Sequence, residues 1–230
     1  MIKKIIKEIK RLLNFKAIED EKSPCYNQSQ NTAPPVRSWS NKELKKIAHL
    51  FEGDIVNVSG WEDKDKEGDF YRNYFTNKRS YSITNYSLGH RYFGKDLKEI
   101  ELDLEKELPS YLVGNFDVVF CHTTLEHIFE IKKAFQNLCL MSRDIVIVVV
   151  PFIQQQHEAP EYNFRDYWRF TPSCLRKLFE INKMGTIYEA TNNEPHAVNY
   201  LFFVGSKKPD RWINKMPSYK KLENICPWVS

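Results

Sequence analysis

The sequence lacks the features that mark membrane-spanning, secreted and zinc-binding proteins. Its longest apolar run, Ile145 to Ile153, is about half of what a membrane span needs. The first 16 residues contain neither a continuous apolar segment nor a small-residue cleavage site, so we expect no secretory signal. The five cysteines are odd in number and form no CxxC pair. This usage predicts reduced thiols in a cytoplasmic protein, with no disulfide framework and no metal site.

Positive charge is also scarce over most of the chain. The formal net charge is +4, but residues 1–16 hold six basic side chains and one glutamate, a local +5 that leaves about −1 for the remaining residues. A nucleic-acid-binding protein would carry its basic patch on the folded body, so nucleic acid is not an expected partner. A pyridine-nucleotide oxidoreductase is not expected either, because no GxGxxG follows the first predicted strand.

The basic N-terminal segment, "MIKKIIKEIKRLLNFK", has its isoleucines and leucines at helical spacing. This is the pattern of a basic amphipathic helix. Such a helix attaches to an anionic membrane surface, here the inner face of the membrane, or packs on its own domain or on a second subunit of an oligomer. We predict residues 1–38 as this helix and a linker arm, residues 39–208 as the main domain, and residues 209–230 as a C-terminal extension.

Helix and strand patterns alternate from residue 39 onward. Ser40 with Glu43 three residues later predicts a helix start, and Thr171 followed by Pro172 predicts another. The β-branched run at 144–151 predicts a strand that is covered on both faces. Further strands are expected near 54–59, 81–87, 99–109, 116–120, 185–191 and 197–208, with a helix in 123–141. This order predicts an α/β fold: a Rossmann-like, doubly wound, mostly parallel sheet with a C-terminal antiparallel strand pair.

Polar residues follow the predicted strands. In doubly wound sheets, ligands bind in the crevice beyond the carboxyl ends of the strands. Convergence of several polar or flexible strand ends on one edge therefore predicts a ligand site there. These ends are Ser59 with Gly60, Asn85, Asp103, His122 to Thr124, and Pro151.

Several of these segments resemble one known family. "FDVVFCHTTLEHI" (116–128), preceded by "ELDLEKELP" (101–109) and followed by "DIVIVVVP" (144–151), is similar in order and content to the class I S-adenosylmethionine-dependent methyltransferases. The likeness covers roughly residues 40–205. "HEAPEYNFRDYWRFTPSCLRKLFE" (157–180) resembles a segment of small-molecule methyltransferases in surface-glycan, capsular polysaccharide pathways.

The resemblance implies a set of cofactor-binding residues, with one departure. The family's first loop is usually GxGxG, and here "VSGWEDKD" places Ser59, Trp61 and Asp63 at the glycine positions. Asn85 stands where the family usually has an acid that holds the ribose. The resemblance implies that each part of S-adenosylmethionine contacts its own residues. Ser59 and Gly60 would line the methionine part, and Asn85 would meet the ribose. Asp103 and Leu104 would lie by the adenine, and His122 near the sulfonium.

Acceptor recognition is expected from the segment after the fifth strand. Methyl transfer needs a group that aligns the acceptor and takes its proton, and histidine suits the proton. His157 in this segment is one candidate base, and His127, expected beside Glu126 in the first turn of the next helix, is the other. The side chains predicted to bind the acceptor are those of Gln155, Gln156, Tyr167 and Arg169, with Arg169 meeting an anionic oxygen. The aromatic residues could instead pack the loop down.

Two functions remain from different classes. The first is methyl transfer to an oxygen or nitrogen of a small polar acceptor such as a nucleotide-linked sugar or a phosphoramidate-type capsule group, with S-adenosylhomocysteine as product. The second is a non-catalytic protein of the same fold that binds a partner, which the altered glycine loop favours. Binding of the cofactor discriminates between them.

Overall fold

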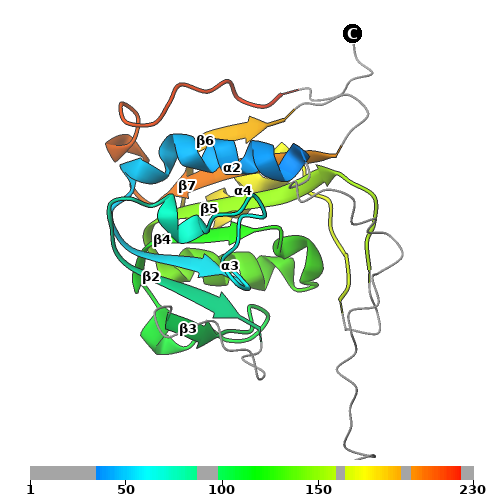
Figure 1. Cartoon of the computed structure of the whole chain (residues 1–230), viewed down its shortest axis with the longest axis horizontal. Coiled ribbons are helices and arrows are strands. Elements are labelled where there is room, and N and C mark those ends of the chain that lie inside the picture. The colour runs from blue at the N-terminus through cyan, green and yellow to red at the C-terminus, as the bar shows by residue number, and fades with distance from the viewer. Residues whose placement is uncertain (1–34, 87–97, 159–163, 193–197, 224–230) are drawn as a thin grey trace, which may run out of the picture. The chain divides into compact units, whose positions relative to one another are not determined.

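In the part of the chain that the computed structural model describes, seven strands form one mixed sheet in the order β3-β2-β1-β4-β5-β7-β6. The described residues are 35–86, 98–158, 164–192 and 198–223, so the predicted N-terminal helix and most of the predicted arm lie outside them. Figure 1 shows the strands side by side across the molecule. Their bounds are Gly53–Val58 (β1), Lys78–Asn85 (β2), Lys98–Glu101 (β3), Phe116–His122 (β4), Ser142–Ile153 (β5), Gly185–Thr191 (β6) and Asn199–Ser206 (β7).

The predicted fold class is confirmed. Strands β1 to β5 pair in parallel, and β7 pairs antiparallel with both β5 and β6. The helices among the described residues are Pro35–Ile47 (α2), Ile131–Met141 (α3) and Pro172–Ile181 (α4). Short 3₁₀ turns lie at Ala48–Leu50 (η1), Tyr71–Asn73 (η2), Ser110–Leu112 (η3), Leu125–His127 (η4) and Pro209–Arg211 (η6). None of the helices in the described ranges has the length and apolar content that crossing a membrane requires.

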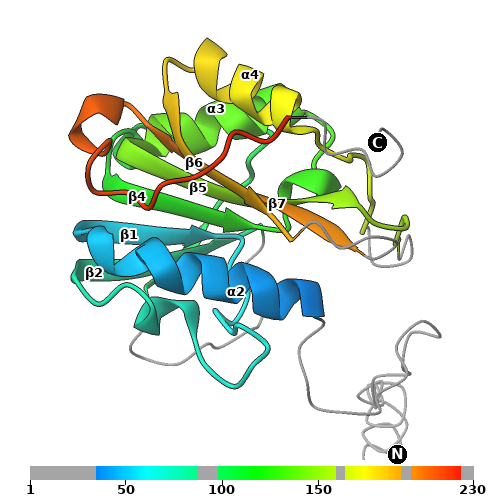
Figure 2. The same cartoon turned by 90° about the horizontal axis from the view of Figure 1, so that it is seen from above.

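The helices cover the two faces of the sheet, with α3 and α4 on one side and α2 on the other (Figure 2). Alternate residues of β5 supply both cores, because successive side chains of a strand point to opposite faces. Val146, Val148 and Val150 pack in the cluster with α3 and α4, whereas Ile145, Ile147 and Val149 pack in the cluster with α2. The prediction that this strand is covered on both faces is confirmed.

The start of the first described helix differs from its prediction. Helix α2 begins at Pro35, so Ser40 lies inside the helix and not at its cap. Its hydroxyl is buried and donates a hydrogen bond to the carbonyl of Arg37 at 2.9 Å. The other predicted cap is confirmed, because the Thr171 side chain accepts a hydrogen bond from the backbone N–H of Cys174 and α4 follows.

The predicted helix after β4 is broken into two parts. Leu125–His127 forms the 3₁₀ turn η4, and α3 begins only at Ile131. The main-chain oxygen of Glu126 accepts hydrogen bonds from the N–H groups of Tyr167 and Trp168, and the N–H of Glu130 donates to the Glu105 carboxylate. In a continuous helix the N–H of Glu130 would donate to the carbonyl of Glu126. Here each of these two groups is bonded to a residue far along the chain instead. Glu126 and His127 lie in a separate turn, and the prediction of a first helical turn is wrong.

Candidate active site

Parallel pairing brings the carboxyl ends of three strands to one edge of the sheet. Val58 at the end of β1 pairs with Cys121 of β4, and Asn57 of β1 pairs with Ile83 of β2. Just beyond β4, the N–H of Thr123 donates a hydrogen bond to the carbonyl of Val149 in β5 at 2.8 Å. Two segments leave this edge: residues 59–77 after β1, called here the first loop, and residues 154–171 after β5, called the second loop.

The first loop follows a backbone path that usually requires glycine. Ser59, Trp61 and Asp63 have positive φ angles of 54°, 50° and 62°. This left-handed conformation is uncommon for residues with a side chain. These are the same positions at which the resemblance places glycines. Gly60 lies between Ser59 and Trp61, and a larger residue would clash there, because its Cβ would lie 2.7 Å from Nδ2 of Asn57.

Asp63 holds this path in place. Its buried carboxylate accepts hydrogen bonds from Nδ2 of Asn57 at 2.9 Å and from the Tyr81 hydroxyl at 2.6 Å, both to Oδ1. Its Oδ2 accepts from the backbone N–H of Arg72 at 3.1 Å. A buried carboxylate with three donors is well satisfied. Asp63 is thus a structural anchor of the first loop.

Asn85 connects the first loop to β3. Its Oδ1 accepts a hydrogen bond from the N–H of Trp61 at 2.9 Å, and its Nδ2 donates to the Trp61 carbonyl at 3.3 Å. The same Nδ2 donates to Oε1 of Glu99 at 2.7 Å. The structure therefore places a carboxylate beside the asparagine that replaces the family's acid. Sequence reasoning missed Glu99, because it lies on the neighbouring strand and not after β2.

The two residues expected near an adenine lie beyond β3, which ends at Glu101. Oδ1 of Asp103 accepts a hydrogen bond from the N–H of Glu105, and its Oδ2 is 3.3 Å from the Lys106 ammonium. Leu104 is buried in the core on the α3 side of the sheet. Asp103 is therefore partly exposed in a turn, and Leu104 packs beneath it.

His122 closes β4 and is held by α2. The guanidinium of Arg37 donates to its Nδ1 at 2.6 Å, so the ring proton lies on Nε2 and is donated to the Ser40 hydroxyl at 2.9 Å. Burial, together with the charges of Arg37 and Lys66, keeps the pKa of His122 well below its ordinary value. His122 is therefore neutral, and both of its ring nitrogens have protein partners.

Arg37 of helix α2 reaches the end of β4, although sequence reasoning placed it in the linker arm. Besides His122, its guanidinium donates to the hydroxyls of Tyr71 at 3.3 Å and Thr123 at 3.1 Å. Its Nε and one N–H of Nη2 have no partner among the residues that the structure describes. Arg37 can therefore donate to an anionic group beside Thr123. No local pattern signals this role, because its partners lie far along the chain.

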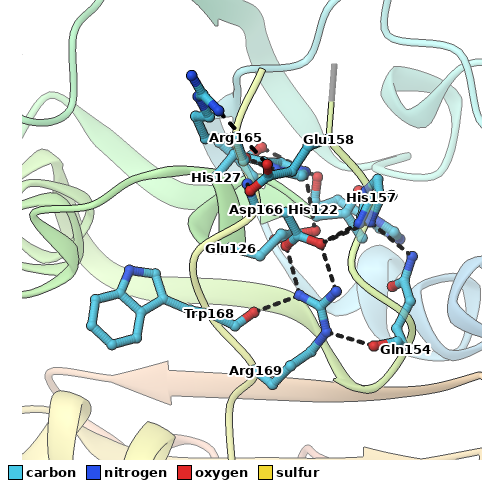
Figure 3. A network of polar contacts seen from close by, with 12 residues as sticks. His122, Glu126, His127, Gln154, His157, Glu158, Arg165, Asp166, Trp168 and Arg169 are labelled. Carbon is cyan, nitrogen blue, oxygen red and sulfur yellow. Dashed lines mark hydrogen bonds and ion pairs between the residues drawn. The ribbon is translucent and has the colours of Figure 1, made fainter. Parts of the chain in front are cut away.

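The second loop is braced by an ion pair between Asp166 and Arg169 (Figure 3). Nη1 and Nη2 of Arg169 each donate to one oxygen of the buried Asp166 carboxylate at 2.6 Å. The remaining N–H groups of Arg169 donate to the main-chain carbonyls of Gln154, Trp168 and Gln155. All five guanidinium donors are then used within the loop. In this arrangement Arg169 has none left for the anionic oxygen that sequence reasoning assigned to it.

The same carboxylate faces His157. Nδ1 of His157 is 3.0 Å from Oδ2 of Asp166, and its backbone N–H donates to that oxygen at 2.8 Å. Although burial opposes ionisation, the hydrogen bond from Arg169 lowers the pKa of Asp166 below its ordinary value. The ionised Asp166 carboxylate therefore faces Nδ1 of His157, and Nε2 of Gln154 lies 3.5 Å from the same nitrogen. His157 is 43% exposed at the side chain.

His127 lies next to His157, with ring centroids 5.1 Å apart. Its Nδ1 donates to the carbonyl of Arg165 at 2.6 Å, so its Nε2 carries a lone pair. Burial lowers the pKa of His127. The structure thus brings together the two histidines that the sequence nominated as bases, and Phe164 contacts both rings.

Glu126 lies beneath this histidine pair and was considered only as a helix cap. Its side chain is 1% exposed, and burial raises its pKa to about 8, with the nearby Asp166 carboxylate acting in the same direction. Its Oε1 is 3.7 Å from Nε2 of His127. Its Oε2 has no hydrogen-bond partner in the described part of the chain. At neutral pH, Glu126 is therefore an uncharged carboxylic acid.

The other predicted acceptor ligands are at the surface of the second loop. Gln155 and Gln156 are exposed, and Nε2 of Gln156 donates to the Glu158 carboxylate. Tyr167 is 47% exposed and contacts the ring of Phe129, with centroids 5.3 Å apart. The indole N–H of Trp168 donates to the carbonyl of Ile128, which ties the loop down. The side chains of Gln155, Gln156 and Tyr167 therefore lie at the protein surface.

Comparison with solved structures identifies the fold. A scan of protein-family models finds no match to the sequence, and no curated protein matches it. Among solved structures, a 1,6-didemethyltoxoflavin-N1-methyltransferase of Burkholderia thailandensis with bound 1,6-didemethyltoxoflavin and S-adenosylhomocysteine matches with a TM-score of 0.55 and 13% identity, over 74% of this chain and 80% of that one.

Two further methyltransferases match in the same way. An S-adenosylmethionine-dependent methyltransferase of Clostridium acetobutylicum has a TM-score of 0.52 and 9% identity, over 75% of this chain and 92% of that one. The magnesium protoporphyrin IX methyltransferase of Synechocystis with bound SAM has a TM-score of 0.50 and 12% identity, over 74% of this chain and 77% of that one. The chain therefore has the fold of class I S-adenosylmethionine-dependent methyltransferases.

Proposed function

We propose that the protein transfers a methyl group from S-adenosylmethionine to an oxygen or nitrogen of a small polar molecule. One observation carries the proposal within this fold. At the carboxyl edge of the sheet, two neighbouring imidazoles lie with Nδ1 facing an acceptor, the Asp166 carboxylate for His157 and the carbonyl of Arg165 for His127, an arrangement that favours a lone pair on Nε2 of each ring. Methyl transfer needs a nearby base of this kind to take the acceptor's proton.

The first loop and its neighbours would hold the cofactor, which when bound supplies a methyl group on positively charged sulfur. Ser59 and Gly60 would line its methionine part. Arg37, across from them at the end of β4, would meet its carboxylate. The left-handed residues fit this role, because the backbone already follows the path of the glycine loop that it replaces.

The ribose and adenine would lie further along the edge. The Asn85 amide and the Glu99 carboxylate, which are 2.7 Å apart, would meet the ribose hydroxyls together. Asp103 and Leu104 would border the adenine. His122, with both nitrogens engaged, would lie near the sulfonium and hold Arg37 toward the cofactor's carboxylate, and it would not itself exchange protons.

His157 is the favoured proton acceptor, with Asp166 as its positioning residue. When Nε2 of His157 takes the acceptor's proton, the ring becomes positive, and the adjacent Asp166 carboxylate stabilises that charge. His127 is the rival base, but burial lowers its pKa and a neutral carbonyl faces its Nδ1. Gln155, Gln156 and Tyr167 would contact the outer part of the acceptor from the protein surface.

For the acceptor we propose a precursor of a surface or capsular polysaccharide, either a nucleotide-linked sugar or a phosphoramidate-type group. The similarity of residues 157–180 to enzymes of such pathways supports this choice. The reaction would take place in the cytoplasm. Residues 1–16 would contact the inner face of the membrane or a second subunit.

Calorimetric titration with S-adenosylhomocysteine tests the cofactor site. The wild-type chain should bind it, and Arg37→Met should bind at least about tenfold more weakly, because a charged hydrogen bond is worth about 1.5–3 kcal/mol. Arg72→Met is the matched control: its side chain packs over the Phe70 ring, and its binding should equal that of the wild type. Absence of binding by a folded wild-type chain would contradict the proposal.

The second candidate function is a non-catalytic protein that uses this fold to bind a partner. One observation favours it: the polar groups of Asp63 and Asn85 are already paired within the protein. In this alternative, the polar contacts of the first loop stabilise the fold and are not available to a cofactor. A folded wild-type chain that binds neither S-adenosylmethionine nor its product would establish this alternative.

A further inference from the structure

Buried polar groups without partners gather beneath the two histidines. Oε2 of Glu126 and Oε1 of Gln154 have no hydrogen-bond partner among the residues that the structure describes, although both atoms are buried. Each side chain lies next to one of the histidines: Nε2 of Gln154 is 3.5 Å from Nδ1 of His157, and Oε1 of Glu126 is 3.7 Å from Nε2 of His127. Unpaired buried polar atoms are costly and rare in native proteins. Their presence at a candidate active site indicates a ligand.

The chemistry of these groups selects the kind of ligand. Glu126 is an uncharged acid that can both donate and accept, and the amide of Gln154 can do the same. Nε2 of His127 offers a lone pair 3.7 Å from the Glu126 carboxyl. Of the two arginines whose charges act on Glu126, Arg169 already uses every donor within the loop, and the donors of Arg37 that are free in the described ranges are those assigned above to the cofactor's carboxylate. A phosphate, which mainly accepts, finds no free donor pair here, and an ammonium, which only donates, leaves the acid proton of Glu126 without a partner.

We propose that Glu126, Gln154 and His127 form a subsite for the uncharged hydroxyl groups of a sugar or polyol. A hydroxyl donates and accepts at once, so it matches an acid, an amide and a neutral imidazole. Vicinal hydroxyls would span the three groups, and the hydroxyl to be methylated would lie toward Nε2 of His157. This inference rests on the proposed function for its place in the reaction. In this proposal the acceptor is recognised through its hydroxyl groups, and not through an anionic oxygen that Arg169 binds.

The first test needs no ligand. If Gln154 is kept for binding, Gln154→Met removes an unpaired buried oxygen and should leave the melting temperature unchanged or raise it by about 2–4 °C. Glu189→Gln is the matched control, because both carboxylate oxygens of the buried Glu189 are bonded by Arg176; its melting temperature should fall. A clear fall for Gln154→Met would show that the amide is a structural partner and would overturn the subsite.

The second test uses three probes on one scaffold: glucose, glucosamine and glucose 6-phosphate. Saturation-transfer NMR on the full chain should show glucose binding, with neither the ammonium nor the phosphate form binding more tightly at pH 7. Gln154→Met and Glu126→Met should each lose most of the glucose signal. No glucose signal in the wild type, a preference for a charged probe, or full signal in both variants would overturn the proposal.

Titration of S-adenosylhomocysteine in the same variants separates this inference from the proposed function. Both variants should bind it as the wild type does. Glucose binding without cofactor binding would leave the hydroxyl subsite standing and remove methyl transfer. Cofactor binding without glucose binding would overturn the hydroxyl subsite and leave the proposed methyl transfer intact.

Discussion

The first and second loops leave the same edge of one sheet but differ in how they satisfy their polar groups. In the first loop, Asp63 receives three donors, and Asn85 at the end of β2 uses both ends of its amide on Trp61 of that loop and on Glu99. Beside the second loop, Glu126 and Gln154 keep buried oxygens without partners in the described ranges. A loop that closes on itself is stable without a ligand, whereas unpaired groups are stabilised only when something binds them. The first loop is therefore closed by its own polar contacts, whereas the groups beside the second loop are left for a ligand.

The largest expected effect concerns catalysis at the second loop. His157→Ala should lower turnover about 10²–10⁴-fold because it removes the proton acceptor. Affinity for S-adenosylhomocysteine should stay unchanged, since the cofactor contacts lie at the first loop. Single-turnover kinetics and calorimetry measure the two quantities separately.

His127→Ala is the comparison for that variant. Near-normal turnover of His157→Ala beside an inactive His127→Ala would move the base to η4. Full activity in both would mean that alignment and sulfonium activation suffice.

The next largest effect concerns stability at the first loop. Asp63→Ala leaves Asn57, Tyr81 and the N–H of Arg72 without their acceptor, and should lower the free energy of unfolding by about 3 kcal/mol. Urea denaturation measures this loss. The neighbouring acid is the control: Glu62 makes only an exposed ion pair with Lys64, so Glu62→Ala should change stability by less than about 0.5 kcal/mol. Equal effects of the two substitutions would refute a self-closed first loop.

A third effect follows from the raised pKa of Glu126. Its pKa rises from 4.5 to about 8 on folding, so between these values the native state holds a proton that the unfolded chain has lost. The wild type should therefore lose stability relative to Glu126→Gln as pH rises through this window, by up to about 1.4 kcal/mol per pH unit. The two proteins should be closest in stability near pH 4.5. Denaturation curves across the window give the difference, and parallel curves would show that Glu126 ionises normally.

The smallest effect tests the left-handed backbone of the first loop. Ser59→Gly relieves about 1–2 kcal/mol of strain but adds about 0.5–1 kcal/mol of chain entropy, so stability should rise by about 0.5 kcal/mol. Lys183→Gly, at a φ of 59° after α4, is the matched control and should gain the same amount. Cofactor affinity should stay constant in both. A large gain in affinity for Ser59→Gly alone would show that the serine holds the loop out of the cofactor's path.

The sheet was predictable because its signals are local. A strand with valine and isoleucine on both faces reads as central, and Thr171 with Pro172 reads as a helix start; both are confirmed. The start of α2 was not predictable in this way. The Ser40 to Glu43 pattern imitates a cap, but Ser40 is buried against His122, which lies far along the chain.

The candidate site was predictable only in part. Sequence reasoning nominated both histidines, which lie together in the structure. It could not find Arg37 or Glu99, because each acts through residues on other elements. It gave Arg169 to the acceptor because an arginine in a polar loop suggests an anion. Only the side-chain geometry shows that the N–H groups of Arg169 all donate to the Asp166 carboxylate and to three main-chain carbonyls.

The left-handed residues at the glycine positions of the first loop have a consequence for how its sequence can change. Ser59 and Trp61 occupy backbone angles that glycine also accepts, so either position can gain or lose glycine by substitution without moving the chain, whereas Asp63 also supplies the carboxylate that holds the loop. A glycine motif can then drift out of a lineage while the loop it once marked keeps its shape. The φ angles after β1 therefore keep a left-handed path that the residues at these positions do not announce.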